Sequence, residues 1–154
     1  MKTGLLFPSI AARDPQGLDV TLPDAFTGER NVVIVAFQRH HQDLVDSWVP
    51  WLEEHAAADA GRRFYELPTI GRVWAPMRLF IDRGMAAAIR EPMVLRRTLT
   101  YYGDVNKVAR PLGIDDRSTI TVLLVDGAGA VRWSGTGGFD PEVAQELERA
   151  LVAS

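Results

Sequence analysis

The sequence predicts an α/β domain in which a central mixed sheet carries helices on both faces and a β-hairpin extends the amino terminus. Two apolar runs rich in β-branched residues, 31–37 and 120–125, have the length of strands buried on both faces. Between and after these runs, apolar residues recur at helical spacing. Strands that alternate with amphipathic helices are typical of an open α/β sheet.

Length and composition indicate one globular domain spanning residues 1–154. A chain of this length buries about 70 % of its unfolded surface, so it needs no disulfide or metal to hold it together. Apolar residues make up 47 % of the chain and charged residues 24 %. The net charge is −3 and the basic residues are dispersed, which predicts no nucleic-acid partner.

The sequence also bears on location. No apolar run is long enough for a transmembrane segment. The apolar part of the opening residues, MKTGLLFPSI, is too short for a secretory signal. We therefore expect a cytoplasmic protein, although a chain without cysteine carries no signal of its redox compartment.

Residues 1–26 predict the hairpin extension. The turn signal is DPQG at 14–17, and Leu18, Val20 and Leu22 alternate with polar residues. Pro23 and Asp24 then end the second strand.

Residues 31–50 hold the segment on which the functional interpretation depends. The strand 31–37 leads into a polar, basic turn at 38–43 and then into a helix over 40–58, with apolar residues at helical spacing. Open α/β sheets bind ligands where a helix begins at the carboxyl end of a central strand. The candidate binding residues are therefore those of the turn: Gln38, Arg39, His40, His41 and Gln42.

The middle of the chain predicts a second core strand and an insertion. Gly61 ends the helix, and Phe64, Tyr65 and Leu67 indicate a strand within 62–70 that Pro68 ends. A helical insertion over 71–93 follows.

The last third predicts a strand, a short helix, a hairpin and a final helix. The strand covers 99–103, and Asp104 caps a helix over 105–112 that Gly113 closes. The strand 120–125 turns at 126–129 and pairs with 130–134. Asp140 and Pro141 begin the last helix as N-cap and first residue.

This order of elements, together with the spacing within 31–50, resembles thioredoxin-like proteins. In that superfamily an aromatic residue ends an apolar strand, one or two cysteines lie at the next helix start, and a proline kinks the helix. Phe37 and Pro50 match the aromatic residue and the proline, which places Gln42 and Val45 at the two cysteine positions. The chain has no cysteine. Thiol–disulfide exchange and thiol peroxidase chemistry need a thiolate, so we predict neither activity.

Two narrower resemblances follow. The FPSI and GLDVTL segments are similar to the start of peroxiredoxin-like proteins. Stretches 100–114 and 121–147 resemble the mitochondrial ATP synthase assembly factor family of subunit-ten type, as does the segment around Trp48. Its members are understood as non-catalytic assembly chaperones of the membrane sector of ATP synthase, which implies protein binding. The matching residues of the final hairpin are Leu123 to Asp126, Arg132, Trp133, Gly135 and Gly137.

The turn residues allow several interpretations. His40, His41 and Asp43 could ligate a metal, but adjacent histidines point in different directions on a helix and no third ligand is near, so we predict no metal or cofactor. Arg39, His40 and Gln42 could instead bind an anionic or peptide group with the N–H groups of the helix start. The simplest alternative is a solvated polar turn.

Two other features have structural interpretations. Trp48 and Trp51 cannot both face the core of a regular helix, so one marks an interaction surface or both cover the helix edge. Arg132 and Trp133 are predicted to stack as a cation on a ring. The run 135–138, GTGG, is a flexible start to the last helix rather than a phosphate cradle, because no Lys-Ser/Thr pair follows it.

We therefore expect a non-catalytic thioredoxin-like protein that acts by binding a protein partner, in the manner of an assembly chaperone. The alternative is a small-molecule or anion binder, or a non-thiol enzyme, that uses the polar turn. Acid–base or serine catalysis has little support, because no Gly-x-Ser-x-Gly elbow occurs and the carboxylates are scattered.

Overall fold

A computed structural model of the chain describes residues 5–71 and 98–153. The predicted insertion over 71–93 lies outside the described residues except for Gly71, which ends a strand.

The central sheet is mixed and has six strands. Their spatial order is β1 (Leu5–Leu6), β8 (Ala130–Thr136), β7 (Thr121–Asp126), β4 (Arg30–Ala36), β5 (Arg62–Gly71) and β6 (Tyr101–Gly103). β4 pairs parallel with β5 and antiparallel with β7, so the two strongly apolar runs of the sequence lie side by side at the centre. The predicted mixed sheet is confirmed.

The amino-terminal hairpin is also confirmed. β2 (Ile10–Arg13) and β3 (Asp19–Leu22) pair antiparallel as a separate two-stranded sheet. Asp14 holds the turn, because its Oδ1 accepts the backbone N–H groups of Gln16 and Leu18 at 2.9 Å each. Gly17 takes a φ of 85°, which a residue with a side chain rarely adopts.

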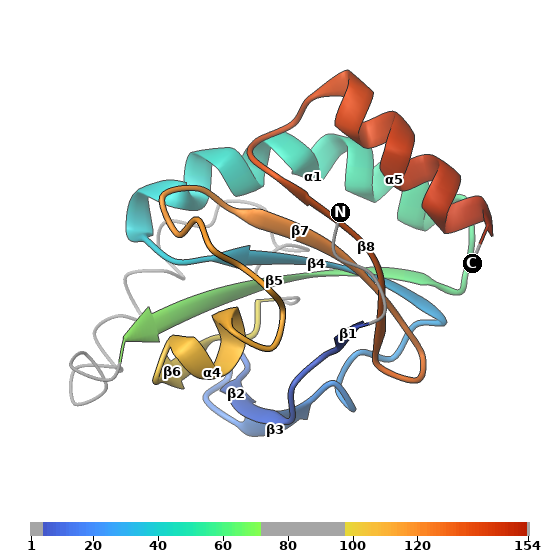
Figure 1. Cartoon of the computed structure of the whole chain (residues 1–154). Helices are drawn as coiled ribbons and strands as arrows, with labels where there is room; N and C mark the ends of the chain where they lie inside the picture. Colours follow the sequence, from blue (N-terminus) through green and yellow to red (C-terminus); the bar gives the residue numbers. More distant parts are fainter. Residues whose placement is uncertain (1–4, 72–97, 154) are drawn as a thin grey trace.

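Helices cover both faces of the sheet (Figure 1). α1 (Gln42–Ala57) and α5 (Pro141–Ala153) lie on one face, and α4 (Asn106–Ala109) and the hairpin lie on the other. Alternate residues of β4 separate the two cores: Val32 and Ile34 face the helices, whereas Val33 and Val35 face the hairpin side.

Strand β5 is longer than predicted, because Pro68 does not end it. Pro68 pairs with Ala36, the last residue of β4, and the strand continues alongside β6 to Gly71. Proline is tolerated where a ladder ends, since its missing N–H is no longer needed there.

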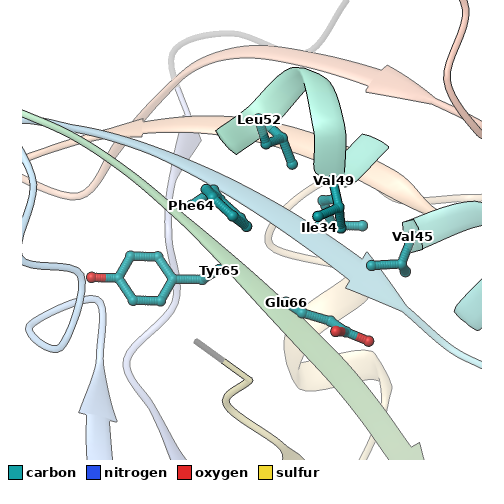
Figure 2. A pocket seen from close by; sticks show the side chains of 7 residues that line it. All are labelled: Ile34, Val45, Val49, Leu52, Phe64, Tyr65 and Glu66. Carbon is teal, nitrogen blue, oxygen red and sulfur yellow. The ribbon is translucent and has the colours of Figure 1, made fainter. Parts of the chain in front are cut away.

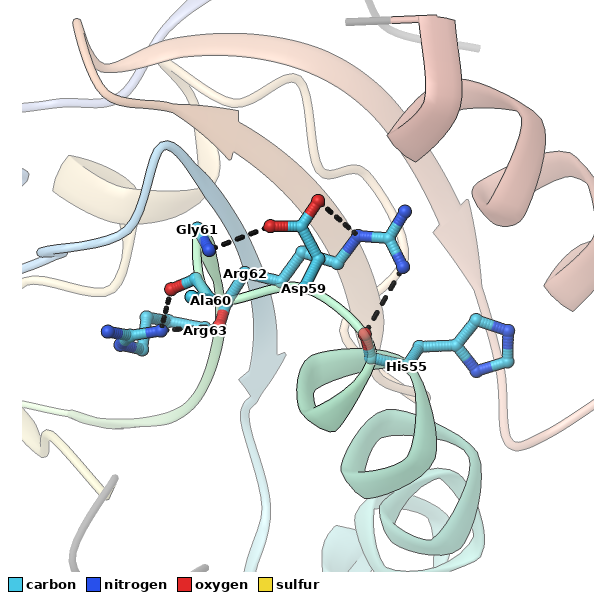
Figure 3. Close-up of polar contacts among 6 residues, drawn as sticks. All are labelled: His55, Asp59, Ala60, Gly61, Arg62 and Arg63. Carbon is cyan, nitrogen blue, oxygen red and sulfur yellow. Dashed lines mark hydrogen bonds and ion pairs between the residues drawn. The ribbon is translucent and has the colours of Figure 1, made fainter.

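The connection between α1 and β5 is held by polar contacts (Figure 3). The Arg62 guanidinium donates to the backbone carbonyl of His55 at 3.2 Å and lies 4.0 Å from the carboxylate of Asp59. Asp59 Oδ1 in turn accepts the N–H of Gly61 at 2.8 Å. Arg62 thereby satisfies a carbonyl in the last turn of α1.

The carboxyl-terminal elements differ from prediction in length. Asp104 Oδ1 accepts the N–H of Asn106 at 2.9 Å, but the α-helix spans only Asn106–Ala109 and its N-cap is Val105 rather than the predicted Asp104. Asp140 caps α5 by accepting the N–H of Glu142 at 2.8 Å. No helix in the described ranges is long and apolar enough to cross a membrane.

The predicted stacking of Arg132 on Trp133 is wrong. Arg132 is the extra residue of a β-bulge, because Leu124 of β7 pairs with Trp133 whereas the next residue, Val125, pairs with Val131. Trp133 is buried under the helices, and the exposed Arg132 instead donates from Nε to Asp126 Oδ2 at 2.7 Å.

Candidate functional site

The corner between β4 and α1 contains all five predicted turn residues. β4 ends at Ala36, a 3-10 turn (η1, Arg39–His41) follows, and α1 begins at Gln42. The side chains of Gln38 and His40 are exposed, and that of Gln42 is half-buried. His41 differs from the expected solvated turn, because its side chain is fully buried at 0 % exposure.

His41 connects three backbone segments. Its Nδ1 accepts the backbone N–H groups of Phe37 at 3.2 Å and Gln38 at 3.3 Å. The remaining proton of a neutral imidazole is then on Nε2, which lies 3.1 Å from the Ser118 carbonyl and donates to it. Burial lowers the pKa of His41, although the bond to Ser118 acts in the opposite direction. His41 is thus a neutral structural link.

The loop before β7 lies against this corner. Gln38 Nε2 donates to the Arg117 carbonyl at 3.2 Å, next to the bond from His41 to Ser118. Asp116 accepts the N–H of Ser118 at 2.9 Å, and hydrogen bonds from Ser118 lower the pKa of Asp116. Two segments far apart in the sequence therefore form one surface, with the exposed carboxylate of Asp116 at its edge.

The resemblance to thioredoxin-like proteins predicts Gln42 and Val45 at the two cysteine positions, and both residues lie in the first turn of α1. Gln42 Nε2 donates to Asp46 Oδ1 at 2.8 Å, one helical turn further along α1. Val45 is buried against the sheet and lines a pocket. The pocket lies between α1 and the β4–β5 pair and has an empty volume of about 210 Å³, part of which is open to solvent.

Glu66 is the polar residue of this pocket (Figure 2). Its side chain is only 3 % exposed and shares the α1 side of β5 with Phe64, whereas Tyr65 points the other way. The other lining residues are Ile34, Val45, Val49 and Leu52.

The environment of Glu66 favours its neutral form. Burial, assisted by the nearby Asp46 carboxylate, raises the pKa of Glu66 to about 7. Hydrogen bonds from the side chains of Gln42 and Thr98 oppose this rise, and Thr98 Oγ1 lies 3.5 Å from Glu66 Oε2.

Sequence reasoning did not select Glu66. The sequence does contain a signal for the burial of this acid. Glu66 is the one charged residue in the run 64–70, and it lies two residues after the buried Phe64, so both side chains point to the same face of the strand.

An aromatic cluster packs behind the corner. Trp48 is fully buried, donates from Nε1 to the Gly137 carbonyl at 3.0 Å, and makes edge contacts with Trp51 and Phe139. Trp51 is half-buried, so one tryptophan faces the core and the other lies at the helix edge. Phe139 is 39 % exposed.

The glycine run at 135–138 is packed rather than free. Gly137 donates its N–H to the Ile120 carbonyl at 3.0 Å. A Cβ at Gly138 would lie 3.1 Å from Leu44 Cδ2, so the segment follows α1 closely. This differs from the flexible start expected for α5, because the glycines allow close approach to α1.

Within the described part of the chain, no three His, Cys, Asp or Glu side chains come together in a group that could hold a metal ion.

Comparisons with known proteins identify the fold. Neither a family model nor a curated protein matches the chain. A thiol:disulfide interchange protein from Bacteroides sp. matches with a TM-score of 0.61 and 20 % identity, over 97 % of this chain and 90 % of that one. Copper-bound yeast Sco1 matches with a TM-score of 0.65 and 15 % identity, over 99 % and 96 %. BsSco, of the Sco family of cytochrome c oxidase assembly proteins, matches with a TM-score of 0.62 and 12 % identity, over 99 % and 98 %. The chain therefore has a thioredoxin-like fold.

Proposed function

We propose that this chain is a non-catalytic thioredoxin-like protein that binds a protein partner through the polar corner at the carboxyl end of β4. The observation that carries the proposal is the way the corner is built. His41 fixes Phe37 and Gln38 from within, and Gln42 and Val45 stand where the thioredoxin-like resemblance places the redox cysteines. The corner thus combines an ordered backbone with exposed polar side chains and no thiol.

The geometry favours protein recognition over the binding of a small molecule. Pockets for small molecules commonly enclose roughly 300 to 1,000 Å³. The cavity beneath α1 is far smaller, with about 10 Å³ of space, roughly what one water molecule needs, and nearly all of its lining is apolar. An anion at the corner would meet the exposed carboxylates of Asp43 and Asp116.

An assembly role is part of the proposal. The Sco family of cytochrome c oxidase assembly proteins offers a precedent on the same fold. The resemblance of 121–147 to ATP synthase assembly factors supports the same class of activity. Both precedents describe proteins that act on other proteins, which agrees with a corner that offers a surface rather than a cavity.

Site-directed cross-linking tests the binding surface. A photoreactive amino acid at Gln38 should capture one defined partner from an extract of the source organism, whereas the same group at the exposed Lys107 on α4 should not. Recovery of that partner by the unmodified protein should fall about tenfold in a Gln38→Ala, His40→Ala double variant, as expected for the loss of central contacts. Lys107→Ala is the matched control.

Two results would contradict the proposal. The first combines two findings. Cross-linking either captures the same proteins from Gln38 and Lys107 or captures none, and a small anion raises the melting temperature of the wild type but not of His40→Ala. The second is turnover by the purified chain in an insulin-reduction or peroxide-consumption assay, where we expect none because both reactions need a thiolate.

A further inference from the structure

Glu66 is a buried acid that the proposed binding surface does not use. It lies in the middle of β5, 3 % exposed, where α1 packs on the sheet. A carboxylate removed from water is strongly disfavoured unless it is paired with a cation. Ionisation of Glu66 should therefore destabilise the packing of the element that covers it, which is the first half of α1.

The groups that face Glu66 come from several elements. From α1 they are Asp46, which is charged, and Gln42, which is neutral and polar. Thr98 faces it from the bridge beside β5, with its Oγ1 3.5 Å from the carboxyl. From β4 the neighbour is the apolar Ile34. Among the described residues, the charge that acts on Glu66 is thus negative.

We propose that Glu66 is a proton-operated switch beneath the first turns of α1. When Glu66 is neutral, Val45 and Val49 pack over it and Gln42 bridges between Glu66 and Asp46. When Glu66 loses its proton, a carboxylate lies in an apolar pocket beside a second carboxylate, and the first half of α1 loosens to admit water.

The response should be confined to the first half of α1. The far end of the helix is held separately, because Arg62 binds the His55 carbonyl at 3.2 Å. α5 packs mainly on β8 and β7. Loosening would therefore reach Gln42, at the edge of the polar corner, without opening the domain.

The switch does not depend on what the corner binds. It operates in the isolated chain, and no partner is needed to measure it. If the chain bound no protein, the switch could still operate, and if the switch failed, the proposed binding surface would remain.

Hydrogen exchange as a function of pH tests the switch. The protection factor of an amide is its intrinsic exchange rate at a given pH divided by its observed rate. It therefore removes the effect of pH on the chemistry of exchange itself. For the amides of Asp46 to Val49 we expect a decrease of about tenfold between pH 6 and pH 8, the change expected for about one pKa unit of coupling. Amides of α5 from Glu146 to Ala150 should keep their protection.

Three variants define the cause. In Glu66→Gln, which is neutral at every pH, the protection of 46–49 should stay constant. In Asp46→Asn, the loss should move to lower pH, because the like charge that opposes ionisation is gone. Glu54→Gln, an exposed acid on the same helix, should behave as the wild type.

The carboxyl ¹³C shift of Glu66 in the wild type gives an independent reading. The proposal is overturned if this carboxyl titrates near the value of an ordinary glutamate, roughly 4.3. It is also overturned if Glu66→Gln shows the same loss of protection as the wild type. The wild-type measurement decides the matter even if a variant fails to fold.

Discussion

Glu66 makes the free energy of unfolding depend on pH. Its pKa is about 7 in the fold against 4.5 in the unfolded chain, so the folded state keeps a proton that the unfolded state releases between these values. The stability that comes from the protonated acid is complete below pH 4.5 and is lost as the pH rises to 7.

The matching prediction concerns Glu66→Gln. Between pH 4.5 and pH 8, the stability of the wild type relative to this variant should fall by up to about 3 kcal/mol, because one pKa unit corresponds to about 1.4 kcal/mol. Urea denaturation of both proteins at the two pH values measures the difference directly. A constant difference would show that Glu66 titrates normally in the fold.

His41 should contribute to stability through the groups it satisfies. In His41→Leu, the N–H groups of Phe37 and Gln38 and the Ser118 carbonyl lose their partner, which should cost about 2 to 4 kcal/mol. His40→Ala is the control, because this exposed neighbour should change stability by less than about 0.5 kcal/mol. Equal effects in urea denaturation would rule out the linking role of His41.

The pH dependence due to His41 has the opposite sign to that of Glu66. Burial lowers the pKa of His41 below its usual value of 6.5. Its contribution to stability is therefore present above pH 6.5 and is lost as the pH falls through the lower, folded value. A proton on Nδ1 would point at the backbone N–H groups of Phe37 and Gln38, so both hydrogen bonds would be lost.

At the scale of elements, close approach decides which glycines matter. A Cβ at Gly135 in β8 would lie 2.6 Å from Trp133 Cη2 and 3.1 Å from Val143 Cγ1, both under the helices. We expect Gly135→Ala to destabilise the protein by about 1 to 3 kcal/mol through overpacking.

Gly127→Ala provides the matched control for this prediction. A Cβ there meets nothing closer than 3.7 Å, and Gly127 does not have a positive φ. Its effect on the urea midpoint should be within about 0.5 kcal/mol. If both variants were neutral, the packing of β8 against α5 would be looser than the structure shows.

Most elements could be predicted because their signals are local. The apolar runs of β4 and β7, the turn at 14–17 and the Asp140 cap each depend on a few neighbouring residues, and each is confirmed. Predictions failed where tertiary contacts decided the outcome. Pro68 continues a strand because β4 ends opposite it, and Arg132 reaches Asp126 from a β-bulge in β8 that depends on the register with β7.

At the scale of the whole molecule, the candidate site could be located but not described from sequence. The position of the corner follows from strand order, which the periodicity of the chain predicts. The burial of His41 depends on Ser118, 77 residues away, and the environment of Glu66 depends on Thr98, 32 residues away. No local pattern carries such information.

The links from Gln38 and His41 to the loop before β7 have a thermodynamic consequence for association. Surface loops commonly lose conformational freedom when a partner immobilises them, and that loss weakens affinity. This corner has already lost much of that freedom during folding, since side chains in one segment hold the backbone of another. A partner would bind a preorganised surface, so its residence time should depend mainly on the contacts that it makes with this surface.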